Sequence, residues 1–458
     1  MGGLNSALSI ASQGLEAQYA GLNVVSNNIA NSNTTGYDRQ VVSLSAAASV
    51  QNGASVDEGV SYDGYTSVRD NVLNLAINAA TSQQGSLTTQ SNLLSQVNTA
   101  FSGTDTGIGA SISTFFSDLS ALSTSPSDPS ARQAVLSAAQ QLTASFQQGA
   151  ASLSDATSSA DQQVTATVAQ INDLTQQIAA LNGQLATITA SGQDGGTIED
   201  QRDALTTQLA QLTGLSSTQT GSTPTLTTGS GTPLVIGSTA YTLQVTTGAD
   251  GLAHVLNAQG EDITSQLTGG TLGGAITTRD DTLPGFSQQL NTLASQFATA
   301  MNAAQAQGYD ANGNPGAAMF QLPADPNAAA QGITVALTSP SGIAVSSDGS
   351  ADSSGNLENL LAVQTNELAS GATPTDAYAD LVQNIGTAGS EANSNLTATT
   401  ASLQQLQTQQ DSESGVSIDE ETTNLLRYQQ AYTAAAKVIS TINDLYTVLN
   451  NISIGDSD

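Results

Sequence analysis

Two apolar seams of nearly equal length, one at each end of the chain, constrain the fold more than any other feature of the sequence. In the first thirty residues, seven apolar side chains and one amide recur at alternating spacings of four and three, which places them along one side of a helix. This N-terminal seam consists of Leu4, Leu8, Ala11, Leu15, Gln18, Leu22, Val25 and Ile29. The C-terminal seam repeats the pattern at Leu425, Tyr428, Tyr432, Ala435, Ile439, Ile442, Tyr446 and Leu449. The chain ends are therefore expected to meet in one coiled-coil unit; two separate amphipathic helices on a globular core are the alternative.

The N-terminal seam needs a partner helix. At about 1.5 Å per residue the seam is roughly 38 Å long. It contains Gly14 and Gly21, and each glycine costs about 1 kcal/mol relative to alanine inside a helix. Helix propensity alone does not hold such a segment, so burial against a second helix is required.

Most of the interior has helical periodicity. The spacing of apolar residues predicts helices over residues 70–101 with an interruption near Gly85, over 108–122, within 131–190, over 282–307, and in segments of 357–410. Uncharged polar residues fill the other faces of these segments, as in a solvated helical bundle.

One stretch between these helices is rich in Gly, Thr and Ser. Residues 216–274 contain short alternating runs at 234–236 and 241–245 and a turn at Asp250-Gly251, which predict a small β-rich insertion. One further strand is expected at 333–337.

The expected fold is therefore mainly α with a small β-rich insertion, and combines long terminal coiled-coil helices with an elongated helical bundle domain. The expected domains are a terminal axial unit formed by 1–60 and 412–458, a bundle formed by 61–215 and 275–411, and the insertion at 216–274.

The charge balance excludes several classes of partner. The chain has 38 acidic residues and a net charge of −31. Its basic residues are Arg39, Arg69, Arg132, Arg202, Arg279, Arg427 and Lys437. Seven scattered cations form no stripe that could neutralise nucleic-acid phosphates or an anionic membrane surface.

No apolar run approaches the ~18 to 20 residues of a membrane span, so membrane insertion is not expected. No basic segment precedes Arg39, so a conventional cleaved signal peptide is not expected either.

The sequence offers no set of residues that would form a catalytic, cofactor or metal site. It has no cysteine and one histidine, His254, which leaves no thiolate or multi-histidine site. The segment from Asp310 to Asn314 begins like a calcium loop but has Pro315 and Gln321 where the template needs Gly and Glu, so a turn is expected. Acidic neighbours at 199–200, 280–281 and 419–421 do not supply two carboxylates converging across a cleft. The last group is expected to stabilise a helix N-terminus.

The segment from Ser26 to Gln40 ends the first helix. Its asparagines tolerate left-handed backbone conformations, and Gly36 permits a sharp reversal before Tyr37 leads into extended chain. A generic helix-to-strand turn would explain the Asn and Gly residues, but it would not require this particular string.

The same string resembles the N-terminal signature of the axial proteins of the bacterial flagellum, S-N-N-I-A-N followed by T-x-G-Y and R-Q. Residues 415–421, 424–425 and 427–432 are similar to the C-terminal box of the same group. Interior segments resemble the flagellar hook-associated protein 1 family in particular: D-Q-R-D-x-L at 200–205, G-x-L-G-G-x-x-x-x-R within 269–279, and G-x-D-x-N-G at 308–313. The chain departs from longer members after Phe320, where those carry a further outer β domain.

The resemblance implies a structural adaptor at the hook-filament junction, required for filament assembly and motility, and not an enzyme. It implies contacts with a ring of like subunits, with the hook protein and with the second hook-filament junction protein. It also implies an export chaperone and secretion through the flagellar type III apparatus to the extracellular flagellum, with terminal helices that order on assembly. A different axial protein (second junction, hook or rod type) and a flagellum-associated glycan hydrolase using acidic pairs such as Asp280 and Asp281 are the competing interpretations.

The resemblance also assigns the assembly contacts to two groups of residues. The N-terminal group is Leu4, Leu8, Leu15, Leu22, Val25, Asn27, Asn28, Ile29, Asn31, Gly36, Tyr37 and Arg39. The C-terminal group is Leu425, Tyr428, Tyr432, Ile439, Ile442, Tyr446 and Leu449.

Overall fold

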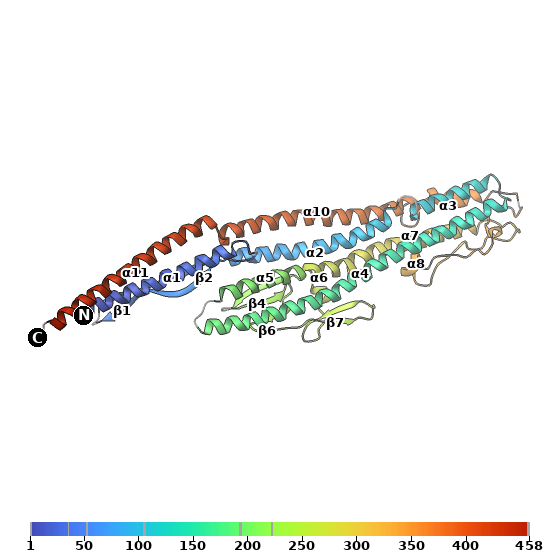
Figure 1. Ribbon diagram of the computed structural model, residues 1–458. Coiled ribbons are helices and arrows are strands. Elements are labelled where there is room, and N and C mark those ends of the chain that lie inside the picture. The colour runs from blue at the N-terminus through green and yellow to red at the C-terminus, as the bar shows by residue number, and fades with distance from the viewer. Residues whose placement is uncertain are drawn as a thin grey trace.

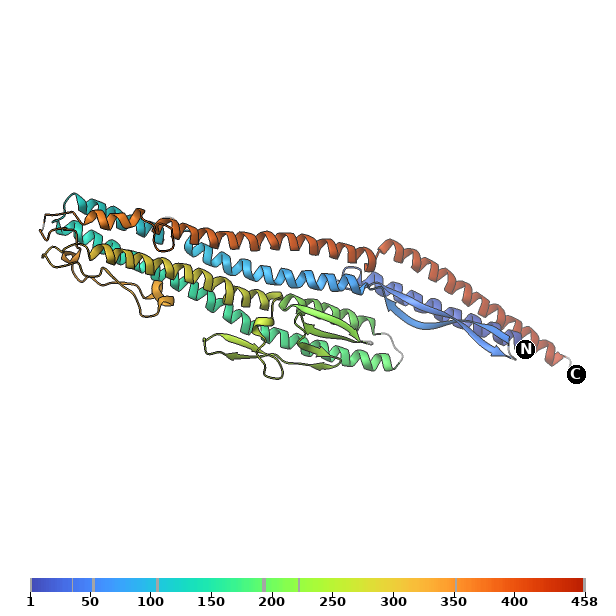
Figure 2. The ribbon, with the colours of Figure 1, turned by 180° about the vertical axis from the view of Figure 1, so that it is seen from behind.

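The protein is a long rod with both chain termini at one end (Figures 1 and 2). The computed structural model describes residues 2–34, 36–51, 54–103, 107–191, 195–220, 223–350 and 352–455. The helices are α1 Gly2–Asn31, α2 Asn71–Phe101, α3 Ile108–Ser123, α4 Pro129–Ala190, α5 Gly196–Leu212, α6 Gly270–Thr277, α7 Leu283–Gln305, α8 Ala329–Gly332, α9 Leu357–Thr365, α10 Pro374–Ser414 and α11 Ile418–Gly455. None of these described helices is long and apolar enough to cross a membrane.

Four small antiparallel sheets accompany the helices in the described parts of the chain. The strands are β1 Gln40–Gln51, β2 Ala54–Ser67, β3 Leu215–Thr220, β4 Thr223–Thr228, β5 Pro233–Ile236, β6 Thr239–Ala240, β7 Gln244–Thr247, β8 Ala253–Leu256, β9 Phe320–Gln321 and β10 Thr334–Val335. They form the hairpin β1-β2, a sheet of order β3-β4-β5-β6, the hairpin β7-β8 and the pair β9-β10. The predicted mainly α fold with a small β-rich region is confirmed, whereas the strand expected at 333–337 is shorter.

The helix α4 runs along most of the bundle (Figure 1). It begins where Asp128 caps the backbone N–H of Ser130 and Pro129 occupies the first turn, a position that lacks an intrahelical donor in any case. Its apolar side chains contribute to two separate cores, one shared with α3, α7 and α9 and one shared with α5, α6 and the β insertion. One continuous helix therefore joins the two halves of the bundle.

Aromatic side chains concentrate in the core at the far end of the rod. All seven phenylalanines of the chain belong to this core, and five of them pair with ring centroids 5.3 to 6.5 Å apart: Phe115, Phe116, Phe146, Phe297 and Phe320. Most of these pairs are edge-to-face, which adds to the stabilisation that burial itself provides. This end of the bundle therefore has a dense core of its own, remote from the chain termini.

The predicted interruption near Gly85 is wrong, because α2 is continuous through this position. A Cβ atom on Gly85 would collide with the backbone carbonyl oxygen of Gln211 at the end of α5 and would lie 3.2 Å from the nitrogen of Thr271 in α6. The glycine permits a close crossing of helices. Its cost to helix propensity is offset by that packing.

The strand expected at 241–245 begins later than predicted, at Gln244. Asn172 of α4 donates to the carbonyl oxygen of Leu243 at 2.8 Å and accepts from its N–H at 2.9 Å. This side chain takes both backbone partners that a strand neighbour would supply, so the chain crosses α4 here instead of extending a sheet. The predicted turn at Asp250-Gly251 is present, and Gly251 has a φ of 81°.

The other isolated motifs have local structural partners. Asp310 accepts hydrogen bonds from the N–H groups of Asn312 and Asn314 at 2.8 Å, as expected for a turn. His254, in β8, lies between Asp250 at 3.1 Å and Asp262 at 2.6 Å, and hydrogen bonds to these two carboxylates raise its pKa. In the ranges that the structure describes, no group of three or more acidic or histidine side chains could hold a metal ion.

Arg279 attaches the β insertion to the bundle. It lies in a π-helical turn, Thr278–Thr282, between α6 and α7, and its side chain is 1% exposed. Its guanidinium group donates to Asp161 of α4 at 2.6 Å and to the carbonyl oxygen of Ala253 at 2.8 Å, while Asp161 also accepts from the N–H of Ala253. Asp280 binds the same guanidinium group at 2.7 Å, so this acidic residue is committed to an ion pair.

Replacing Arg279 with Met is expected to lower the free energy of unfolding by about 3 kcal/mol, because it removes the buried partner of Asp161 and of the Ala253 carbonyl group. Urea denaturation followed by circular dichroism measures the change. The control is Asp281→Asn, an exposed neighbour, which is expected to change stability by no more than about 0.5 kcal/mol. Equal stabilities for the two variants would show that Arg279 does not anchor the insertion.

Candidate assembly interface

The two terminal helices lie side by side and run in opposite directions (Figures 1 and 2). The seam residues face the contact between them, but most are only half-buried: Leu4, Leu8, Leu15, Leu22, Ile29, Leu425, Tyr428, Tyr432, Ile439 and Tyr446. Val25 and Ile442 are buried, and Leu449 is 44% exposed. Leu449 is about one turn past Tyr446, whose hydroxyl group contacts Asn5 near the start of α1, so it lies at the end of the helix pair. A single copy of the chain therefore buries the seam incompletely.

Gly21 has a packing role in this helix pair. A Cβ atom at this position would lie 2.6 Å from the ring of Tyr428, so only glycine lets the ring lie against α1. The cost of the glycine to helix propensity is therefore offset by an aromatic contact at the middle of the seam.

A second face of α1 is covered by the β1-β2 hairpin, which extends along it (Figure 2). Ala17 and Val24 are buried on this face, and Gly59 of β2 approaches the backbone of Ile10 so closely that an added Cβ atom would lie 3.3 Å away. The sequence predicted only extended chain after Tyr37. The terminal unit thus consists of three layers: α11, α1 and the hairpin.

The amide of Asn28 joins these layers where they meet the bundle. Its oxygen accepts from the N–H of Gln40 and from the hydroxyl of Tyr37, both at 2.9 Å. Its nitrogen donates to the carbonyl oxygen of Gln40 at 2.8 Å and to the carboxylate of Glu421 at 3.1 Å. Asn28 is 1% exposed and Glu421 is 3% exposed. One buried side chain therefore uses its whole hydrogen-bonding capacity to hold the start of β1 and the first turn of α11.

Tyr37 keeps its proton in this arrangement. Burial, followed by the nearby negative charge of Asp200, raises its pKa to about 12. A neutral hydroxyl group is required to donate to Asn28, so the interaction persists across the physiological pH range.

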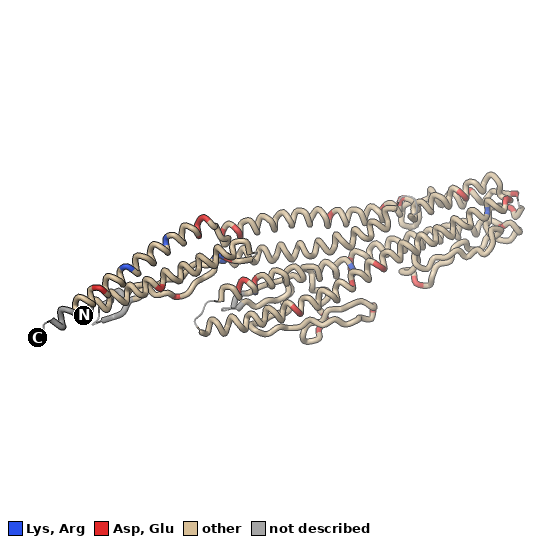
Figure 3. Tube along the Cα trace, in the orientation of Figure 1, with Lys and Arg blue, Asp and Glu red and all other residues tan. Residues whose placement is uncertain are grey.

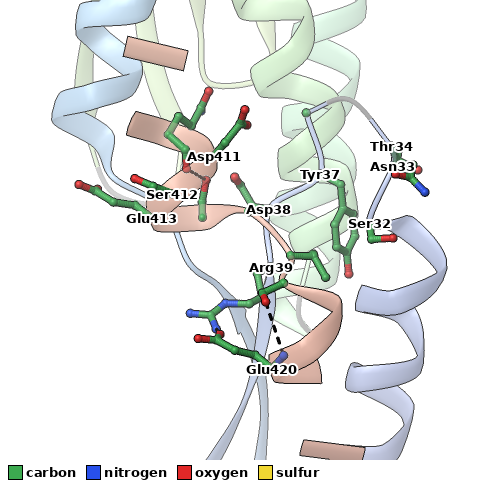
Figure 4. Close-up of a pocket in the computed structure, with 16 residues that line it drawn as sticks. Ser32, Asn33, Thr34, Tyr37, Asp38, Arg39, Asp411, Ser412, Glu413 and Glu420 are labelled. Carbon is green, nitrogen blue, oxygen red and sulfur yellow. Dashed lines mark hydrogen bonds and ion pairs between the residues drawn. The ribbon is translucent and has the colours of Figure 1, made fainter. Parts of the chain in front are cut away.

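The backbone of the two signature segments also meets at this point. The N–H of Arg39 donates to the carbonyl oxygen of Ser414, the last residue of α10, at 2.8 Å. The guanidinium group of Arg39 binds Glu420 in the first turn of α11 at 3.1 Å, as Figure 4 shows. Glu420 and Glu421 therefore contact the N-terminal signature, in addition to lying where acidic groups favour a helix N-terminus.

Arg69, in the link between β2 and α2, clamps the terminal unit to the bundle. It binds Asp38 at 2.8 Å, the carbonyl oxygen of Gly196 at 3.0 Å, and the carboxylates of Glu199 and Asp200 in α5. Arg69 is 11% exposed. A single guanidinium group therefore connects the loop after α1, the start of α2 and the start of α5.

The single positive charge of Arg69 cannot neutralise all the carboxylates that surround it. Burial raises the pKa of Asp200 to about 6, although the hydrogen bond and charge of Arg69 act in the opposite direction. Burial likewise raises the pKa of Asp38. One oxygen of Asp200 is buried without a hydrogen-bond partner in the described structure, which is the position where a proton would be held.

Most of the exposed large apolar side chains that the structure describes lie on the terminal unit. On α1 and the hairpin they are Ile10, Tyr19, Val41, Leu44 and Tyr62; on α11 they are Ile418, Leu426, Val438, Leu445, Val448 and Leu449. The helix α11 therefore has two apolar faces, one against α1 and one directed outward. Exposed apolar surface of this extent indicates a protein-protein contact.

The remaining predicted contact residues lie at the ends of this unit. Asn31 and Arg39 are half-buried, whereas Asn27 and Gly36 are exposed; Gly36 has a φ of 79°. Thr35 of the signature lies outside the described residues. The predicted contact groups omit Gln40, Arg69 and Glu421, although Gln40 and Glu421 lie within the two signature segments. The signal for Arg69 was its rarity, as one of only seven cations in the chain.

Three sequence families match successive parts of the chain. Residues 94–320 match the family described as the flagellar hook-associated protein FlgK helical domain. Residues 8–37 match the flagella basal body rod protein family, and residues 407–452 match the C-terminal family of the flagellar basal body rod FlgEFG proteins. The N-terminal match contains the signature up to Tyr37, and the C-terminal match contains the whole of the second signature segment.

Whole-chain relatives agree with these matches. Flagellar hook-associated protein 1 of Salmonella typhimurium is 30% identical over 98% of this chain and 100% of the relative, and that of Bacillus subtilis is 26% identical over 98% of each. The Salmonella alignment runs over 552 positions, more than the 458 residues here, so that relative has segments without a counterpart in this chain. The structure described as the flagellar hook junction protein FlgK from Burkholderia pseudomallei is similar in fold, with a TM-score of 0.68 and 21% identity over 74% of this chain and 99% of that one.

Replacing Asn28 with Ala is expected to destabilise the packing of the terminal unit by about 2 kcal/mol or more, because Gln40 and Glu421 lose buried hydrogen-bond partners. The measurement is swimming in a flagellated host that lacks its own copy of the protein and expresses the variant. Asn27→Ala, on the exposed side of the same helical turn, is the control and should swim normally. Normal swimming of the Asn28 variant would contradict the role assigned to its amide.

The raised pKa of Asp200 predicts a pH dependence of stability. The native state binds a proton at Asp200 up to about pH 6, whereas the unfolded chain releases it near pH 4. The contribution of Asp200 to the free energy of unfolding therefore falls as pH rises from about 4 to 7, by an amount on the order of 2 kcal/mol. Urea denaturation at pH 4.5 and 7.5 should show a smaller decrease for Asp200→Asn than for the natural chain.

The exposed α4 residue Asp173 provides the matching control, since Asp173→Asn also removes one carboxylate but lies outside the clamp. An Asp200→Asn variant with the same pH dependence as the Asp173→Asn variant would contradict the assignment.

Proposed function

The chain belongs to the flagellar hook-associated protein 1 family, and on this premise we propose how it joins the hook of the bacterial flagellum to the filament. It is a structural component of the flagellum, a hook-filament junction protein. Its terminal unit, built from α1, α11 and the β1-β2 hairpin, makes the contacts with neighbouring subunits. The bundle and the β insertion form the outer part of each subunit.

One observation carries this proposal: the terminal unit has apolar surface on more faces than one chain can cover. The seam between α1 and α11 is mostly half-buried, and a second apolar face of α11 is exposed. The bundle has the opposite character, with complete burial of residues such as Phe115, Leu142 and Phe297. The terminal helices therefore complete their burial against other copies and order fully on assembly, whereas the bundle is stable by itself.

The neighbours of the terminal unit are of three kinds. Like copies lie beside it in a ring, the hook protein lies on one side of the ring, and the second junction protein lies on the other. These contacts are heterologous, because different surfaces of one subunit meet different surfaces of the next. An export chaperone and the flagellar type III apparatus deliver the chain to the extracellular end of the growing flagellum.

The proposed role does not include catalysis. A glycan hydrolase would rely on acidic pairs such as Asp280 and Asp281, but Asp280 is held by Arg279 beside α4 and Asp281 is exposed. Membership among the second junction proteins, or among the hook or rod proteins, does not account for the match of residues 94–320 to the helical domain of this family.

The experiment that tests the proposal is a double substitution in the seam, Leu15→Asp with Ile442→Asp. Two carboxylates within the α1-α11 contact are expected to abolish incorporation at the junction and hence swimming, because an unpaired charge is costly to bury. The bundle is expected to retain its unfolding midpoint in urea, since neither residue contributes to its core. Fluorescent labelling of isolated flagella measures incorporation.

The matched control is Ser12→Asp with Asn443→Asp, which adds the same charges at exposed positions of the same helices. The control should assemble and swim. Incorporation of the seam variant at the junction would refute the assembly role of the terminal unit.

A further inference from the structure

Electrostatic repulsion between copies opposes the self-association of this chain. Each copy carries a net charge of −31, so two copies repel each other as they approach. A contact between copies is therefore most favourable where the few cations of one copy meet carboxylates of the next.

Five of the seven cations are already committed within the described chain. Arg132 and Arg279 are buried, and Arg39, Arg69 and Arg202 form ion pairs with carboxylates of the same chain. Arg427 and Lys437 are exposed, and neither forms an ion pair with any residue that the structure describes. Arg427 lies over the ring of Tyr428 at 5.3 Å from its centroid.

Both of these cations belong to α11, the helix beside the chain termini that carries blue segments in Figure 3. At 3.6 residues per turn, Lys437 lies about 180° around the helix from the seam residue Tyr428, whereas Arg427 lies about 100° from it, on the flank of the seam. The exposed apolar residues Leu426, Val438, Leu445 and Val448 lie on the same half of the helix as the two cations, its outward face. This outward face of α11 therefore combines two unpaired positive charges with uncovered apolar surface.

The complementary surface is an open cleft where the terminal unit meets the bundle (Figure 4). The cleft has a volume of about 690 Å³ and lies between the loop after α1 and the link from α10 to α11. Its charged lining residues are Asp38, Arg39, Asp411, Glu413 and Glu420. Asp38 and Glu420 are paired with arginines, whereas Asp411 and Glu413 are exposed and have no cation partner among the described residues.

One exposed apolar side chain borders the same cleft. Ile418, 53% exposed, follows the lining residue Ser417. The cleft therefore offers unpaired negative charge beside an exposed apolar side chain, the counterpart of the outward face of α11.

We propose that the outward face of α11 in one copy docks at the cleft of the neighbouring copy, with Arg427 and Lys437 facing Asp411 and Glu413. The contact is heterologous, since it joins two different surfaces, and it repeats from copy to copy. Its pairing of charges fixes the register of adjacent subunits, and the exposed apolar side chains of α11, together with Ile418 beside the cleft, supply burial. This contact rests on the proposed junction function and specifies which surfaces of the ring meet.

Charge reversal tests the pairing in a flagellated host that lacks its own copy. Arg427→Glu with Lys437→Glu, and separately Asp411→Lys with Glu413→Lys, should each lower the fraction of cells that bear filaments by about tenfold or more. The fourfold variant restores opposite charges and should recover most filaments. The control, Asp155→Lys with Asp173→Lys on exposed positions of α4, should leave filaments unchanged. A fourfold variant no better than the double variants would overturn the proposal.

A crosslinking experiment separates this proposal from the junction function. The chain has no cysteine, so Ser412→Cys in the cleft and Ala434→Cys on the outward face of α11 introduce the only thiols and leave the charges intact. A short bis-maleimide should link copies into a ladder in isolated flagella of the double variant and not of either single variant. Normal flagella that carry the protein at the junction but give no ladder would overturn this contact alone. Absence of the protein from the junction would overturn the function itself.

Discussion

The four hydrogen bonds of the Asn28 amide are the interaction on which the arrangement of the chain ends depends. They join α1, the start of β1 and the first turn of α11 at one buried point. Without that point the terminal unit would be held to the bundle only by the Arg69 clamp and by the hydrogen bond from the N–H of Arg39 to Ser414. The Glu421 carboxylate depends on the same amide, because removing this partner would leave a buried charge with one fewer hydrogen bond. The geometry of this junction therefore determines how the outward apolar faces are presented to a neighbour.

Rare cations occupy the positions where separate parts of the rod are joined. Arg39 links the loop after α1 to α11, Arg69 links the terminal unit to α5, and Arg279 links the β insertion to α4. In a chain with 38 carboxylates, a buried arginine finds acidic partners readily and binds several of them at once through its planar fork of donors. Positive charge in this protein therefore marks contacts, either within the copy or, at Arg427 and Lys437, between copies.

Periodicity in the sequence predicted the elements whose structure depends on local burial. The two seams, the long α4 and the helices near 108–122 and 282–307 were found because their apolar residues repeat at helical spacing. The β1-β2 hairpin was missed because its strands, although consecutive in the chain, are rich in Ala, Ser and Gly and lack a regular alternation of large apolar residues. The Arg69 clamp was missed because it joins segments distant in sequence. Gly85 was misinterpreted for the same reason: only the crossing of α5 and α6 shows why a glycine stands inside a continuous helix. The signature around Asn28 was recognised by resemblance, while the bonds that explain it required the structure.

The nested order of the chain separates folding from assembly. The bundle is formed by the continuous interior from α2 to α10 and contains the dense aromatic core, so its burial is complete within one copy. The terminal segments are contiguous with the two ends of that bundle, so a folded bundle holds their starting points close together and lowers the entropic cost of bringing residues nearly 400 positions apart into contact. A subunit can therefore combine a stable bundle with two terminal helices, α1 and α11, that are incompletely buried. On the proposed function, the free energy of that missing burial is released when another copy covers the terminal helices.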